Sequence, residues 1–214
     1  MERARHAASC GYDALLVVTP YYVRPGRRGL LRHHGEVADA TDLPVVLHAE
    51  PERTGCELDP EVAAELAARH DNVVAVLETT RDLERLRSRY RGADLALLCG
   101  VDRLLHAYAR AGAVGAVSAV ANLAPGHVAE LLATGEDAAR GRELQAELAE
   151  LVEALELDAD PVPLKAALAE LGLCRDEVRS PLATLDAASR ETLRLLLRRS
   201  PALRSPEREA VEQE

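Results

Sequence analysis

Apolar residues follow two different periods along this chain. Short runs rich in valine, leucine and alanine predict strands, and stretches of about ten to fifteen residues with apolar positions at helical spacing predict helices. The predicted strands are residues 14–18, 44–48, 73–77, 95–99 and 114–118, and the helices between them are 27–41, 59–70, 81–90 and 102–112. Strands that alternate with helices at a repeat of about 20 to 30 residues are typical of a (β/α)8 barrel. We therefore predict an α/β fold of the TIM-barrel type.

The strand pattern ends after residue 122. Amphipathic helices are predicted from there at 124–134, 136–156, 161–172 and 186–199, separated by turns that contain proline or glycine. Residues 200–214 are mostly charged and are expected to be disordered. The predicted organisation is a partial (β/α) barrel over 1–122, a C-terminal helical region over 123–199 and a disordered tail over 200–214.

The five predicted strands are fewer than the eight of a closed barrel. We expect an incomplete barrel whose outer strands, 14–18 and 114–118, each leave one edge unpaired. Three explanations stay open at this point. The true start codon lies upstream of Met1, the chain is a decayed gene fragment, or it pairs with another chain.

Composition and charge exclude several classes of protein. The 214 residues include 48% hydrophobic side chains, which can build a sizeable core, and that core is aliphatic because Phe and Trp are absent. The net charge of −10 argues against nucleic-acid binding, which needs a basic face. Four cysteines without a CxxC spacing suggest neither a zinc site nor a disulfide framework, so we expect a reducing cytoplasmic setting. No apolar run approaches the length of a membrane span.

Several segments resemble, in order, the motifs of the dihydrodipicolinate synthase and N-acetylneuraminate lyase family of class I aldolases. They are VVTPYYVRP at 17–25, LHAEPERTG at 47–55, VVAVLET at 73–79, LCG at 98–100, GAVGAVS at 112–118, Asn122 and PVPLK at 161–165. The match reaches over roughly residues 4–199, which is more specific than one motif alone. The resemblance implies a TIM barrel with a helical extension and a pyruvate-dependent aldol condensation or cleavage, for example 4-hydroxy-tetrahydrodipicolinate synthesis. It also implies an N-terminal part with three further strands and a carboxylate-binding turn.

By this resemblance, Leu77 lies where the family carries the lysine that forms an imine with pyruvate. The chain has one lysine, Lys165, in a segment that opens a late helix, so no other predicted strand supplies an amine. Leucine has no nucleophilic group, and its side chain fills about the space of a lysine stem. We therefore expect the chain to be inactive as a Schiff-base aldolase.

Five other positions match family residues with known roles. His48 lies where a tyrosine shuttles protons, Tyr22 matches a tyrosine that reaches across a dimer interface, and Arg53 matches the carboxylate-binding arginine of the synthase branch. Gly100 and Val117 match positions that line the substrate pocket. Imidazole exchanges protons near neutral pH, and guanidinium binds carboxylates through two hydrogen bonds. Each residue also has a plain structural alternative: a strand-end hydrogen bond, a subunit contact or an ion pair.

Three functional hypotheses remain open. The chain is an inactive family member, or a lyase or hydratase of altered mechanism that acts on a small keto acid such as pyruvate through His48 and Arg53, or a non-catalytic partner of an active homologous subunit or of its own copies. We expect no cofactor and no metal, because no HxH, HExxH or paired-carboxylate spacing is present. A metal site built from His48, Glu50, Glu78 and Asp102 is a weaker alternative.

Overall fold

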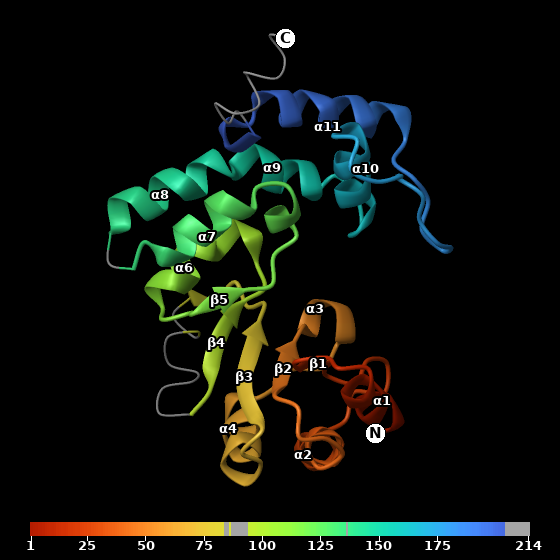
Figure 1. Ribbon diagram of the computed structural model, residues 1–214, viewed down its shortest axis with the longest axis vertical. Helices are drawn as coiled ribbons and strands as arrows, with labels where there is room; N and C mark the ends of the chain where they lie inside the picture. The colour runs from red at the N-terminus through yellow and green to blue at the C-terminus, as the bar shows by residue number, and fades with distance from the viewer. Residues whose placement is uncertain (84–85, 87–93, 136, 204–214) are drawn as a thin grey trace. The chain divides into compact units, whose positions relative to one another are not determined.

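The computed structural model describes residues 1–83, 86, 94–135 and 137–203 (Figure 1). Its contacts divide the chain into two compact units. Met1–Val101 with Ala107–Val117 forms the first, called here the sheet unit. Asp102–His106 with Ser118–Glu214 forms the second, called here the helical unit. The first unit therefore ends a few residues before the predicted boundary at 122, and a short piece from the middle of the chain belongs to the second.

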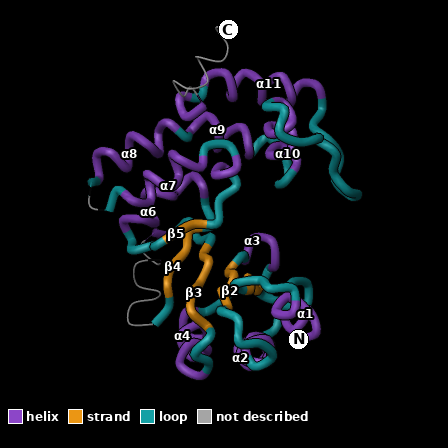
Figure 2. The backbone as a smooth tube through the Cα atoms, in the orientation of Figure 1, coloured by secondary structure: helices purple, strands orange, loops and turns teal. Residues whose placement is uncertain are grey.

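The sheet unit contains five parallel strands in sequence order. They are β1 (Leu15–Val18), β2 (Val45–Ala49), β3 (Val73–Glu78), β4 (Ala96–Cys99) and β5 (Gly115–Ala116). Figure 2 shows them as neighbouring orange segments. The prediction of an α/β fold with five parallel strands is confirmed. Among the described residues β1 and β5 each pair with one strand only, so this sheet has two open edges.

Helices cover one face of the sheet. They include α2 (Arg27–Ala38) and α4 (Pro60–Arg69), which pack on each other, and α4 packs on β3; α1 (Glu2–Ser9) precedes β1 in the chain. The side chains of Leu47, Val76 and Cys99 on this covered face are fully buried. Alternate residues of a strand point to opposite faces, so these three positions define the helix-covered side and their neighbours define the other side.

Two helical segments of this region differ from the predicted pattern. The predicted helix at 102–112 consists of a 3₁₀ turn, η1 (Asp102–Leu104), followed by α6 (Leu105–Arg110). A single helical turn, α3 (Pro51–Thr54), was not predicted because four residues are too few to show a period. Most of the predicted helix at 81–90 lies outside the described residues.

The helical unit packs on a leucine core. Its helices are α7 (Pro125–Ala133), α8 (Ala138–Glu147), α9 (Ala149–Leu155), α10 (Val162–Glu170) and α11 (Ala187–Arg199), with 3₁₀ turns η2 (Val120–Asn122) and η3 (Pro201–Leu203). The predicted helix at 136–156 is two helices, because the chain turns at the buried Leu148. Of the tail expected to be disordered, residues 201–203 form η3, and 204–214 lie outside the described residues.

Two further observations limit the chemistry of the chain. Cys10, Cys56, Cys99 and Cys174 are free thiols. None of the helices within the described residues has the length and apolar character needed to cross a membrane.

Candidate functional site

One register row crosses all five strands near their carboxyl ends. It contains Val18, His48, Leu77, Leu98 and Gly115, one residue from each strand. Residues in register on parallel strands point to the same face, so their side chains lie side by side on the face opposite the covering helices. Leu77 is central in the row, between His48 and Leu98, and it is 2% exposed. The row therefore places the imidazole of His48 directly beside Leu77.

Leu77 is packed from the neighbouring strand end as well as within its row. A Cβ atom placed on Gly100 would lie 3.3 Å from Cδ1 of Leu77 and 2.8 Å from Cγ2 of Thr79. The backbone N–H of Gly100 donates to the carbonyl of Glu78 at 2.9 Å. Gly100 thus allows the end of β4 to approach Leu77 closely, which explains why this position has no side chain. Leu77 behaves as a core residue.

Glu78 closes the end of β3. It is fully buried, and its Oε1 accepts hydrogen bonds from the backbone N–H groups of Thr79 (3.1 Å) and Thr80 (3.2 Å). The Thr79 hydroxyl donates to the carbonyl of Ala49 at 2.9 Å, and the Tyr108 hydroxyl donates to the carbonyl of Thr80 at 2.7 Å. These bonds fix the turn after β3, and the carboxylate of Glu78 stabilises the backbone of that turn.

His48 has an acidic neighbour. Its Nε2 lies 3.6 Å from Oε2 of Glu50, and the two side chains are 21% and 19% exposed. A carboxylate at this distance can orient the imidazole ring. His48, Glu50 and Leu77 therefore form a small cluster with two ionisable side chains and no amine.

A buried hydroxyl network holds the segment after β2. The Thr54 hydroxyl donates to the Glu50 carbonyl at 2.8 Å and accepts from the hydroxyl of Thr19 at 3.1 Å and from the N–H of Cys56 at 3.2 Å. Thr19 is fully buried and Thr54 is 5% exposed. These threonines position α3 and with it Arg53, whose side chain is exposed. No role was predicted for Thr19 or Thr54, although both lie within the motif segments at 17–25 and 47–55.

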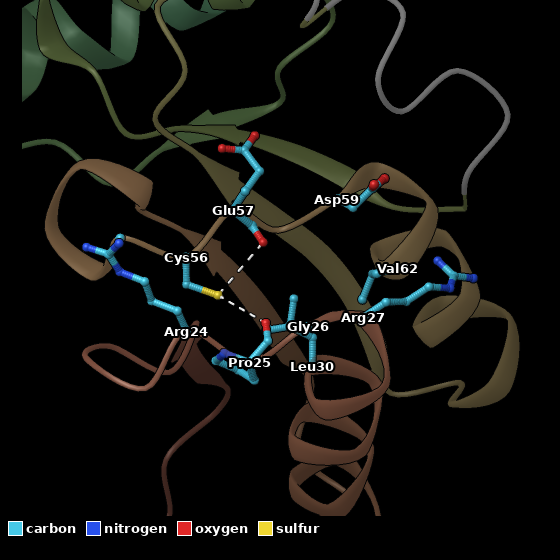
Figure 3. Close-up of a pocket in the computed structure, with 10 residues that line it drawn as sticks. Arg24, Pro25, Gly26, Arg27, Leu30, Cys56, Glu57, Asp59 and Val62 are labelled. Atoms are coloured by element: carbon cyan, nitrogen blue, oxygen red, sulfur yellow. Dashed lines mark hydrogen bonds between the residues drawn. The ribbon is translucent and has the colours of Figure 1, made fainter.

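A cavity of about 350 Å³ lies beside this segment, between the loop before α2 and the loop before α4. Figure 3 shows the Cys56 thiol in its wall, bonded to the carbonyl of Pro25 at 3.8 Å. Burial raises the pKa of Cys56, although the nearby Arg24 opposes the shift, so the thiol is protonated at neutral pH. Arg24 lies against Gly55, where a Cβ would be 2.7 Å from its Nε and where φ is +64°.

Besides Arg53, two of the predicted site residues are exposed to solvent. Tyr22 is 92% exposed and has a left-handed backbone with φ of 72°, and Tyr21 beside it is 71% exposed. Val117 is 51% exposed, and its N–H donates to the Cys99 carbonyl at 2.9 Å. The structure therefore brings His48 and Gly100 to Leu77, and it leaves Tyr22 and Val117 on the surface. Their functional roles stay predictions.

Asp102 belongs to the helical unit, where it holds the turn at η2. Its Oδ2 accepts the N–H of Val120 at 2.9 Å, and burial raises the pKa of its carboxyl against the opposing hydrogen bond from Ser118. Among the described residues, no group of three or more His, Cys, Asp and Glu side chains is arranged to hold a metal ion.

Residues 1–200 match the model of the dihydrodipicolinate synthetase family. The 4-hydroxy-tetrahydrodipicolinate synthase of Geobacter metallireducens is 36% identical over 202 residues, which span 92% of this chain and 69% of that protein. The synthase of Methanothrix thermoacetophila is 40% identical and covers 92% and 68% of the two chains.

Solved structures give the same result for the fold. Dihydrodipicolinate synthase from Thermotoga maritima superimposes with a TM-score of 0.89 at 33% identity, covering 94% of this chain and 71% of that one. The enzyme from Acinetobacter baumannii, crystallised with pyruvate, gives a TM-score of 0.88 at 34% identity, covering 92% and 69%. The predicted resemblance and the barrel-type fold are both confirmed.

Proposed function

The chain belongs to the dihydrodipicolinate synthetase family, and from that premise we propose that it has lost the family's Schiff-base chemistry. An aldol reaction of this class needs an amine that attacks the ketone of pyruvate and forms an imine. Leu77 occupies the position that the motif assigns to that amine. The buried packing of Leu77 between His48 and Leu98 is the observation that carries the proposal.

The single lysine of the chain strengthens this proposal. Lys165 belongs to the helical unit, on α10, and the sheet unit contains no lysine. Positioning groups alone do not replace a covalent nucleophile, so loss of the amine removes the covalent route. Arg53 then remains as a group for binding the carboxylate of a small keto acid, with Gly100 and Val117 as backbone positions near the strand ends.

A second candidate function rests on the pair of His48 and Glu50. An imidazole 3.6 Å from a carboxylate is a suitable general base for removing a proton next to a carbonyl. In this function the chain is a lyase or hydratase on a small keto acid, and Tyr22 of a second copy completes the proton relay.

A third candidate function is a non-catalytic partner in the cytoplasm. The open edge of β1 favours it, because this edge adjoins a mostly apolar cavity of about 370 Å³ that includes Leu16, Tyr21 and Val37. Strand edges of this kind accept further strands from another chain. Size measurement of the purified chain with and without an active homologue tests it, and a monomer that binds no homologue contradicts it.

Exchange of the pyruvate methyl protons with deuterium separates the first two functions. An imine gives an enamine that exchanges these protons, and a general base exchanges them through an enolate. We expect the wild-type chain to exchange no faster than buffer. Exchange that disappears in His48→Ala supports the second function. Exchange that persists in His48→Ala and disappears in Lys165→Gln contradicts the first proposal, because another amine would then form the imine.

A further inference from the structure

The helical unit contains a cavity lined in part by the PVPLK segment at 161–165. Its volume is about 510 Å³, and it lies between α10 and the segment that leads to α11. Figure 1 shows α10 and α11 joined by this long segment. The lining residues are Pro161, Lys165, Glu177, Val178, Arg179 and Leu182. Nothing in the proposed function uses this cavity.

Two positively charged side chains line the cavity, although the chain as a whole has a net charge of −10. Lys165 is half-buried, Arg179 is exposed, and within the described residues neither charged group has an ion pair or a hydrogen bond. Glu177 is the one acidic lining residue, and it lies 3.8 Å from the exposed Arg175 outside the cavity. The lining therefore carries an excess of one positive charge.

Neighbouring charges of the same region are paired, unlike those two cations. Glu170 on α10 accepts hydrogen bonds from Arg190 (3.0 Å) and Arg194 (2.8 Å) of α11. Arg190 also binds the carboxylate of Asp176. The hydrogen bond from Arg194 is the largest of the effects that lower the pKa of Glu170.

This cluster gives the cavity a fixed wall. Asp176 immediately precedes the lining residues Glu177, Val178 and Arg179, so its bond to Arg190 ties the start of this segment to α11. A turn with the Leu182 N–H bonded to the Arg179 carbonyl at 3.1 Å continues the wall. These bonds hold the backbone that carries Arg179. The charged groups of Lys165 and Arg179 have no partner among the described residues, so they can bind a ligand.

We propose that this cavity binds a small monocarboxylate with an apolar body. Lys165 and Arg179 would take the carboxylate, because ammonium and guanidinium groups form charge-assisted hydrogen bonds with it. Val178, Leu182 and Pro161 would contact the hydrocarbon part. Glu177 limits the negative charge that a ligand can carry, because its carboxylate repels a second negative charge and so disfavours phosphate and dicarboxylates. The site is independent of Leu77 and of the sheet unit's chemistry.

The single lysine makes a direct test possible. Reductive methylation with ¹³C-formaldehyde labels only the amine of Lys165 and the amino terminus, and it preserves the positive charge. Nuclear magnetic resonance then follows the labelled Lys165 methyl groups during titration of the full chain, and Lys165→Gln identifies their signal. The probes are 3-methylbutanoate, its neutral amide 3-methylbutanamide, and inorganic phosphate, each at constant ionic strength.

We expect a saturable shift of the Lys165 signal with 3-methylbutanoate and none with the amide or with phosphate. Calorimetry on the unlabelled chain is expected to give binding that weakens roughly tenfold in Lys165→Gln and in Arg179→Gln. Arg142→Gln is the matched control, because it removes one cation of the same unit outside the cavity, and its affinity stays within about twofold. In Glu177→Gln, phosphate binding appears.

Three results overturn the proposal. One is the absence of a saturable shift with 3-methylbutanoate. Another is an equal response to 3-methylbutanamide or to phosphate in the wild-type chain, because charge and apolar body would then not be recognised together. The third is an affinity for 3-methylbutanoate that changes no more in Arg179→Gln than in the control variant Arg142→Gln.

Discussion

The strand row at Leu77 and the cavity at Lys165 contrast in almost every physical property. Leu77 is 2% exposed and apolar, and a neighbouring glycine backbone lies against it. Lys165 is half-buried and charged, and a polar segment lies beside it. By the family resemblance the first position is where an amine is expected, and the second is where the chain's one lysine side chain lies.

On the proposal that Leu77 replaces the family's amine, the contrast teaches how a family fold can persist without its nucleophile. Leucine and the stem of lysine have similar bulk, so under this proposal the replacement satisfies the packing of the sheet and removes the reactive atom. Backbone features around the position, including Gly100 and the buried Glu78, remain because they support the strand ends. The packing at residue 77 depends on the hydrocarbon part of the side chain, whereas the family's chemistry depends on a terminal amine.

Truncation of the two contrasted residues is the change with the largest expected effect. Leu77→Ala opens a cavity in a packed region, and we expect it to lower the free energy of unfolding by about 2 to 5 kcal/mol. Lys165→Ala removes a half-exposed side chain that has no ion pair with any residue the structure describes, and it is expected to cost less than about 0.5 kcal/mol. Urea unfolding of the two variants measures the difference, and equal costs would contradict the assignment of Leu77 to the core.

His34 sharpens the comparison through pH, because the sheet unit buries this ionisable side chain without a hydrogen-bond partner among the described residues. Burial, together with His33, lowers its pKa to about 4. An unfolded histidine titrates near pH 6.5, so between these values the unfolded chain holds more protons. Stability therefore rises with pH through this window and is lost on acidification.

Replacing His34 with leucine removes both the unpartnered ring and its titration. We expect His34→Leu to raise the unfolding free energy by about 1 to 3 kcal/mol, with the larger gain at pH 5 than at pH 7. His6→Gln changes an exposed histidine and serves as the control. A gain that is the same at both pH values would show that burial does not shift the titration of His34.

Gly100 tests the contact that surrounds Leu77. Gly100→Ala places a Cβ 2.8 Å from Thr79 and 3.3 Å from Leu77, so we expect a loss of about 1 to 3 kcal/mol. Gly126→Ala in the helical unit meets nothing within 4 Å and is expected to be neutral. Thermal unfolding compares the pair. A similar loss of stability in both variants would contradict the close packing of Gly100 against Leu77.

Gly55 has the smallest expected effect. Its φ of +64° strains any L side chain, and we expect Gly55→Ala to cost about 1 kcal/mol. Arg24 is flexible and can move away from the added methyl group. The cost should therefore be the same in an Arg24→Ala background, measured by urea unfolding, and a cost that vanishes there would assign it to the contact with Arg24.

The five strands were predictable because apolar runs mark buried strands, whereas two helical details were not. The turn at Leu148 interrupts a stretch whose apolar pattern, with Leu144 and Leu151, is continuous, so periodicity alone predicts one helix. The single turn α3 begins at Pro51 and is too short for any period.

The candidate sites also contain some contacts that the sequence predicts and others that it does not. The motif order placed His48, Leu77 and Gly100 on strand ends, and their contact follows from parallel register. The bond between Thr19 and Thr54 joins residues 35 positions apart, and the cavity at Lys165 depends on the pairing of Arg190 with Asp176. Such contacts arise from tertiary packing, which a local pattern does not contain.

Borohydride trapping tests the central claim most directly. The purified chain and Leu77→Lys are each incubated with pyruvate and reduced, and peptide mass spectrometry locates any added three-carbon unit. We predict no adduct on the wild-type chain and an adduct at residue 77 of Leu77→Lys. An adduct on the wild-type chain, at Lys165 or at the amino terminus, would contradict the claim that Leu77 ends imine chemistry in this protein.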